Sequence, residues 1–251
     1  MTDMGTSMDN AGAHAIGNRE AYATRAIFFV SGFGAASWAP LVPVLRERLA
    51  IGDDLLGLLL LCIGIGSILT MPLAGTLAER IGCRRVLIVG GVLYAASLLS
   101  ICFVDSFRVA VPVIFLFGGL MGCVDVVMNI AAVIVEQGIG RRIMSGMHGF
   151  WSLGGFVGAG LYGVWVGLVG LTPFQSTFIA AAIMLTLTAA FGRYLIPYGG
   201  GGGTLIAIPR GIVAFIGVAA FIAFLSEGAV MDWSGVYLTA VRGMDLALAG
   251  M

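Results

Sequence analysis

The sequence contains no lysine, and charged residues of any kind are scarce. All 13 basic side chains are arginine. A chain without lysine cannot form a lysine Schiff base, which excludes the retinal-binding class of seven-helix proteins. Charged residues make up 10% of the chain, whereas a soluble domain carries about 25%. Together with a hydrophobic fraction of 59%, this shortage means that the chain cannot cover itself with polar surface, and we predict that its solvent is lipid.

Several functional classes lack the residues that they need. The formal net charge is zero, so neither a nucleic acid nor an acidic polymer is indicated as a partner. The histidines are isolated, and no nucleophile elbow or phosphate-binding glycine loop is present. We therefore predict a protein that is not an enzyme and that holds no metal or cofactor. The cysteines lack zinc-site or disulfide spacing and are interpreted as small buried hydrophobes: Cys62, Cys83, Cys102 and Cys123.

What the chain does contain is a series of long apolar segments. Each is about as long as a helix that crosses a bilayer. The pattern predicts an all-α integral membrane protein with seven spans, at residues 26–45, 55–77, 86–104, 109–135, 147–169, 174–191 and 211–241.

The arginines set the predicted orientation. If the N-terminus is cytoplasmic, most of them fall on the inner side of the membrane, and the outer side holds only Arg46, Arg48, Arg108 and Arg242. The polar residues 1–25 are then expected to be a disordered cytoplasmic tail. Residues 197–210 contain five consecutive glycines, Gly199 to Gly203, and are expected to be a flexible cytoplasmic linker.

A short polar segment between the second and third spans carries a recognisable motif. It reads Gly-Thr-Leu-Ala-Glu-Arg-Ile-Gly-Cys-Arg-Arg from residue 75 and resembles the signature loop of the major facilitator superfamily. Members of that superfamily have two halves of about six helices each. The resemblance implies that residues 26–196 form a six-helix N-terminal half and that residues 211–251 hold the first helix of an incomplete second half. The chain is therefore expected to be truncated.

The resemblance also implies a gating role for this loop, which in the family latches one conformation against the other half. The residues concerned are Gly75, Glu79, Arg80, Gly82, Arg84 and Arg85. The glycines would allow close approach of the helix end and the turn, and the acid would face a helix N-terminus or an arginine. The arginines would pair with acids or hold lipid phosphates. An alternative is that they only determine topology.

Polar residues inside the fourth and fifth spans are the candidates for a proton or solute path. Asp125 and Asn129 share one helix face with Glu136. A carboxylate near mid-membrane is costly unless it is paired or faces water, and it typically marks an ion, proton or solute path. Asp125 is therefore a candidate for such a path. The alternative is a neutral structural hydrogen bond to Asn129. His148, near the start of the fifth span, could shuttle protons, or could cap its helix.

The seventh span contains Glu227 and Asp232, and the nearby Gly228 and Gly235 are candidates for a break in the helix. The segments His-Gly-Phe-Trp-Ser from residue 148 and Glu-Gly-Ala-Val-Met-Asp-Trp-Ser from residue 227 resemble a bacterial inner-membrane subgroup related to fucose permease-like transporters. That resemblance implies that Glu227 and Trp233 face the transport cavity. In the first span, Trp38 could stack against a sugar-like solute, or could serve as an interfacial anchor.

These features together predict a secondary transporter of a small, sugar-like or other organic solute in a bacterial inner membrane. It would be proton-coupled and work by alternating access. The alternative is a truncated, non-transporting or structural membrane protein that needs a partner to form a cavity. A parallel homodimer would be one way to rebuild that cavity.

Overall fold

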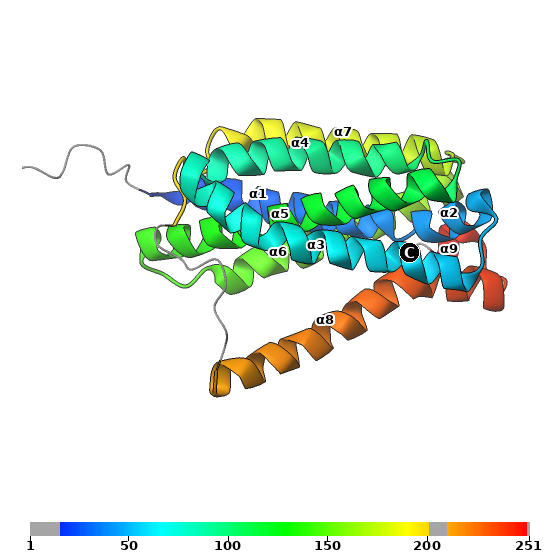
Figure 1. Ribbon diagram of the computed structural model, residues 1–251. Coiled ribbons are helices and arrows are strands. Elements are labelled where there is room, and N and C mark those ends of the chain that lie inside the picture. The colour runs from blue at the N-terminus through cyan, green and yellow to red at the C-terminus, as the bar shows by residue number, and fades with distance from the viewer. Residues whose placement is uncertain (1–15, 201–209, 250–251) are drawn as a thin grey trace, which may run out of the picture.

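The computed structural model describes residues 16–200 and 210–249, and every regular element in these ranges is a helix (Figure 1). The predicted all-helical fold is confirmed, with seven helices long and apolar enough to cross a membrane. In chain order the elements are α1 (Asn18–Trp38), α2 (Leu41–Leu49), α3 (Asp53–Ile81), α4 (Cys83–Ile101), α5 (Phe107–Ile139), α6 (Met144–Gly163), the π-helix η1 (Val164–Leu168), α7 (Pro173–Gly192), α8 (Ile212–Val236), the π-helix η2 (Tyr237–Val241) and α9 (Leu246–Ala249).

The first span differs from its prediction at both ends. Helix α1 begins at Asn18, so residues 18–25 are helical and the prediction of a disordered tail up to residue 25 was wrong for them. Residues 1–15 lie outside the described part of the chain. The span is also interrupted between α1 and α2, where Pro40 lacks the N–H that a continuous helix needs.

The polar segment at 75–87 is a helix junction rather than a loop. Helix α3 continues through Ile81 and α4 begins at Cys83, so Gly82 alone separates them. Its backbone has φ +87° and ψ +149°, a region that is essentially open only to glycine. The loop predicted here was wrong in its extent, because the polar residues on both sides of Gly82 belong to helical turns.

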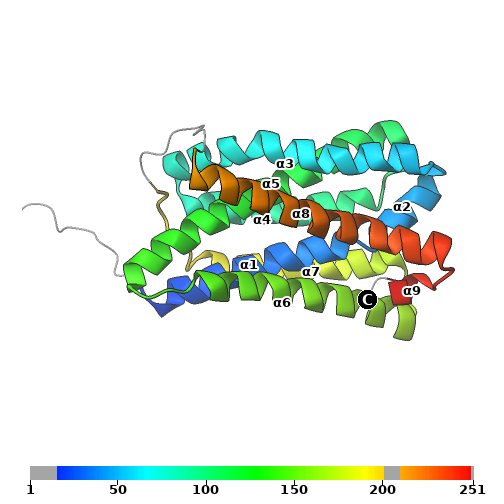
Figure 2. The same cartoon turned by 90° about the horizontal axis from the view of Figure 1, so that it is seen from below.

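Six helices pack as a bundle in which α3 lies along α5, α1 along α6, and α4 along α5 and α7. Small residues allow this close packing. A Cβ atom at Gly32 of α1 would overlap the backbone carbonyl of Trp151 in α6, and one at Gly118 of α5 would overlap the backbone of Ile63 in α3. Figures 1 and 2 show the resulting elongated bundle, with α4 and α7 on one side and α3, α5, α1 and α6 towards the other.

Helix α8 stands apart from this bundle. It approaches the bundle at the end where α2 lies and diverges from it towards its own N-terminus (Figure 1). The helix is continuous through Gly228 and Gly235, so the predicted break at these residues was wrong; the first irregularity is the π-helical turn that begins at Tyr237. Most of the glycine-rich linker before α8 lies outside the described residues.

Candidate functional site

A cluster of polar residues involves α4, α5 and α6, with Asp125 of α5 between the other two helices in its electrostatic contacts. Asp125 of α5 is half-buried and is close enough to Tyr94 of α4 and His148 of α6 to act electrostatically on both. Asn129 lies one turn further along α5 and donates a 2.9 Å hydrogen bond from Nδ2 to the backbone carbonyl oxygen of Asp125. The carboxylate itself therefore stays available for other partners. The structure thus brings together the predicted residues Asp125, Asn129 and His148.

His148 packs against α1 and follows a helix start that Glu136 caps. Its ring meets the ring of Phe28 in α1 edge to face, with centroids 5.4 Å apart. Four residues earlier, α6 begins, and Oε2 of Glu136 accepts hydrogen bonds from the amides of Ile143 (2.7 Å) and Met144 (2.9 Å). Because these amides have no partner within their own helix, Glu136 secures the first turn of α6. The imidazole remains exposed beside the Asp125 carboxylate.

A second polar contact joins α8 to the bundle near the end that the arginine distribution predicts to face outwards, here called the outer end. Nε1 of Trp38, the last residue of α1, donates to Oδ1 of Asp232 over 3.2 Å. The Trp38 side chain is 3% exposed, and its ring packs against Phe117 with centroids 5.5 Å apart. The ring is therefore buried among protein groups, and a solute could not stack on it in this conformation.

Aromatic rings connect the outer contact to the polar cluster. Phe117 of α5 is fully buried and packs on one side against Trp38 and on the other against Tyr94, at centroid distances of 5.5 Å and 5.3 Å. Tyr94 is itself fully buried, and its hydroxyl has no hydrogen-bond partner among the residues that the structure describes. Sequence reasoning missed both rings, although Tyr94 could have been noticed as a hydroxyl within an otherwise apolar span.

The remaining candidates on α8 lie in different surroundings. Glu227 is exposed and has no hydrogen-bond or ion-pair partner within 16–200 and 210–249. Trp233 reaches the bundle, since a Cβ atom built at Gly57 of α3 would lie 3.7 Å from its Cζ2 atom. The structure therefore places Trp233 and Asp232 at the contact with the bundle and leaves Glu227 outside it.

The gating-loop candidates gather around Gly82, at the opposite end of the bundle, which is predicted to be cytoplasmic and is here called the inner end. The segment that follows α7 runs across this junction. Its carbonyl oxygens at Leu195 and Ile196 accept from Nε (2.7 Å) and the amide (3.0 Å) of Arg84. Backbone carbonyls of the segment between α7 and the linker thus accept hydrogen bonds from the first turn of α4. Gly75 differs from its prediction: a Cβ atom there would meet nothing within 4 Å, so no close approach requires glycine at that position.

A polar cleft of about 410 Å³ opens beside this junction. Its walls combine the end of α3, the start of α4 and the segment after α7, with the residues Glu79, Arg80, Ile81, Gly82, Arg84, Arg85, Pro197, Tyr198 and Gly199. Apart from Gly75, the predicted gating residues therefore lie together.

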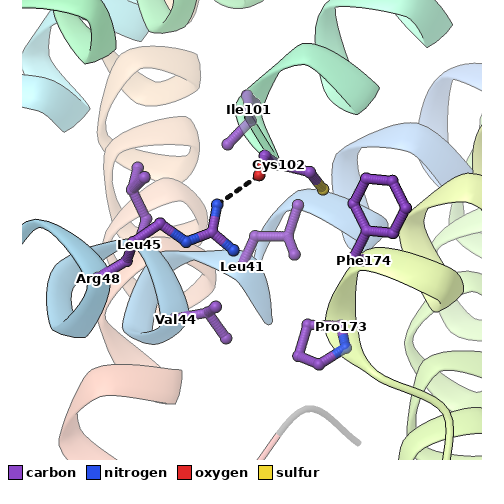
Figure 3. A pocket seen from close by; sticks show the side chains of 8 residues that line it. All are labelled: Leu41, Val44, Leu45, Arg48, Ile101, Cys102, Pro173 and Phe174. Atoms are coloured by element: carbon purple, nitrogen blue, oxygen red, sulfur yellow. Dashed lines mark hydrogen bonds between the residues drawn. The ribbon is translucent and has the colours of Figure 1, made fainter. Parts of the chain in front are cut away.

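Figure 3 shows a smaller cavity at the outer end, between α2, the end of α4 and the start of α7. Its volume of about 10 Å³ is about enough for one water molecule, so it cannot hold an organic solute. Nη1 of Arg48 donates to the carbonyl oxygen of Cys102 over 2.6 Å and joins α2 to α4. Burial raises the pKa of the Cys102 thiol. The residues around this cavity hold α2 against α4 and do not form a solute site.

The sequence matches the family model of the Major Facilitator Superfamily over residues 26–251. It is 45% identical over 232 residues to an uncharacterised transporter of this type from Yersinia pestis, covering 91% of this chain and 60% of that protein. It is also 30% identical over 223 residues to the membrane protein MosC of Rhizobium meliloti, covering 86% of this chain and 53% of MosC. The chain therefore spans little more than half the length of these curated relatives.

Among solved structures, the fold is similar to a crystal structure of a mutant of the nucleoside transporter NupG. The TM-score is 0.63 at 15% sequence identity, and the match covers 90% of this chain and 60% of that chain. At this identity the likeness concerns the fold alone. The narrower resemblance to fucose permease-like transporters stays a prediction.

Proposed function

The chain belongs to the Major Facilitator Superfamily, and we propose that it contributes one complete helical half and part of the second to a secondary transporter. The transporter would carry a small organic solute by alternating access, in which two halves rock around a central site. It would be coupled to protons through Asp125. Its location would be a bacterial inner membrane, with the N-terminus in the cytoplasm.

The observation that supports coupling is the placement of Asp125. It lies near the middle of the spanning helix α5, half-buried, and interacts electrostatically with Tyr94 and His148. A carboxylate at this depth is costly and usually serves an ion or proton path. Because the Asn129 amide bonds to the backbone carbonyl rather than to the carboxylate, a purely structural role for the Asp125 side chain has less support.

The solute class is tested with a panel. The sequence resemblance favours a sugar-like molecule, and the structural neighbour is named as a nucleoside transporter. The panel would contain labelled sugars, nucleosides and organic acids. The protein would be purified from its native membrane at its natural length and reconstituted into liposomes with an imposed proton gradient.

We expect at least one solute to accumulate against its gradient and a protonophore to abolish the accumulation. Asp125→Asn keeps the shape of the side chain but cannot release a proton. It should lower accumulation by about tenfold or more, while solute exchange without a gradient persists. Cys123→Ser, two residues away on α5, is the matched control. If Asp125→Asn accumulates solute as the unaltered protein does, the assignment of the coupling residue is overturned. If accumulation by the unaltered protein does not depend on the proton gradient, proton coupling itself is overturned.

The alternative of a shorter product that works as a parallel homodimer has a separate test. Intact mass would show whether the protein in its membrane has the 26.0 kDa of this chain. If it has, crosslinking in the membrane should give dimers. If only monomers are recovered after crosslinking, the dimer is refuted.

A further inference from the structure

We propose that Trp38 and Asp232 form the contact that closes the outer end of the transport path between the two halves, and that they do not bind the solute. This assignment rests on the proposed alternating-access function. The two residues come from opposite halves: Trp38 ends α1 in the first, and Asp232 lies on α8, the first helix of the second. Their hydrogen bond of 3.2 Å is therefore a bond between parts that must separate during transport.

The same short stretch of α8 supplies the other contacts with the bundle. Immediately after Asp232, Trp233 lies beside Gly57 of α3. A Cβ atom at Gly235 would sit 3.6 Å from Cδ of Pro43 and 3.7 Å from the carbonyl oxygen of Ala39. These groups belong to α2 and to its break from α1. The contact with α8 is therefore concentrated where the first span changes direction.

The rest of α8 is separated from the bundle. Phe215 and Phe224, in the half of the helix nearer its N-terminus, are 70% and 72% exposed. Figure 1 shows this part of the helix diverging from the bundle, while the C-terminal end of α8 converges on it. The Trp38–Asp232 bond therefore lies where α8 meets the first half.

The chemistry of the pair suits a contact that forms and breaks. The indole N–H can only donate, and a buried donor that loses its acceptor is costly. Because Trp38 is 3% exposed, its N–H depends on Asp232 in this conformation, and the bond favours the closed outer end. Phe117 acts as a positioning residue, since its ring packs against Trp38 and limits where the indole can point.

An accessibility measurement tests the assignment without requiring transport. Val236 is 6% exposed beside the contact. In a background where every native cysteine is replaced by serine, including Cys62, Cys83, Cys102 and Cys123, Val236→Cys reports opening through its labelling by a membrane-impermeant maleimide added from outside. Trp38→Phe keeps a ring but removes the donor and should raise the labelling rate by about tenfold. Asp232→Ala should raise it similarly, and the double variant no further, because both changes remove one bond.

Two controls separate this effect from general disturbance. Trp165→Phe changes a tryptophan in η1 and should leave labelling unchanged. Asp232→Asn keeps an acceptor oxygen and should raise labelling less than Asp232→Ala. Labelling that stays unchanged in both Trp38→Phe and Asp232→Ala would overturn the proposal, and so would additive effects in the double variant.

Transport kinetics then distinguish a closing contact from a solute contact. If the pair closes the outer end, Trp38→Phe should change Vmax and leave the KM for solute within about twofold. A rise in KM of tenfold with unchanged labelling would assign the pair to solute binding and overturn the proposal. Raised labelling in a protein that transports no member of the panel would support the closing contact and count against the transporter function. The two proposals can therefore fail independently.

Discussion

Gly82 lies so close to the carbonyl oxygen of Pro197 that no side chain fits between them. Its φ of +87° is also one that residues with a Cβ rarely adopt. The junction of α3 and α4 is thereby joined to the segment that leads into the linker.

We therefore expect Gly82→Ala to lower the free energy of unfolding by about 1–3 kcal/mol. The matched control is Gly75→Ala on α3, where a Cβ atom meets nothing within 4 Å. Thermal unfolding in detergent, followed by fluorescence-detected size exclusion, would measure both. Equal stability of the two variants would contradict the account of the junction.

The packing of α1 against α6 gives a second prediction. A Cβ atom at Gly154 would overlap the carbonyl oxygen of Phe29, whereas one at Gly160 on the same helix would meet nothing within 4 Å. Gly154→Ala should force the two helices apart and cost about 1–3 kcal/mol, and Gly160→Ala should be near neutral. Denaturant unfolding in detergent would measure the difference, and a larger cost at Gly160 would refute this packing.

The start of α6 gives a third prediction. Because Glu136 accepts from the amides of Ile143 and Met144, Glu136→Ala should free both donors and fray the first turn. Without this partner the first turn opens more often, so amide exchange in it should accelerate about fivefold. Glu136→Gln keeps an acceptor and should show a smaller effect. Hydrogen–deuterium exchange read by mass spectrometry would measure it, and identical exchange in all three proteins would exclude the cap.

The small cavity between α2, α4 and α7 gives a fourth prediction, which concerns the thiol of Cys102. Since burial raises the pKa of Cys102, the thiol stays protonated near neutral pH, and the reactive thiolate is scarce. In a variant with Cys102 as the sole cysteine, alkylation should be slow at pH 7 in the folded protein, rise as the pH increases, and become fast after denaturation. Mass spectrometry of the alkylated protein would follow the rate. Equal rates in folded and denatured protein would show that the thiol is not protected.

The family and its helical fold could be predicted because long uncharged runs and one short motif carry the signal. A run such as residues 86–104 has one structural solution in lipid, and the arginines around Gly82 mark its inner end. Helix boundaries were less accessible. Residues 18–25 and the turns around Gly82 are polar but helical, because helices project beyond the apolar part of a span.

The candidate site was predictable only where one helix carries it. Asp125 and Asn129 share a helix face, and spacing alone relates them. The proximity of Asp125 to Tyr94 and the pairing of Trp38 with Asp232 depend on how separate helices pack, and no spacing in the sequence encodes that. The break predicted at Gly228 failed because a glycine within a spanning helix is tolerated when the surrounding backbone hydrogen bonds stay intact.

The attachment of α8 near one end has a mechanical consequence. Because the described contacts of α8 with the bundle gather around residues 232–236, the helix can act as a lever whose fulcrum lies beside Pro43. From Gly235 back to Ile212, the arm is about 35 Å long at 1.5 Å per residue. A turn of about 10° at the fulcrum would therefore sweep the inner tip through about 6 Å. For rigid-body motion of α8, a small adjustment near Pro43 would thus become a large displacement at the end of the helix that is predicted to face the cytoplasm.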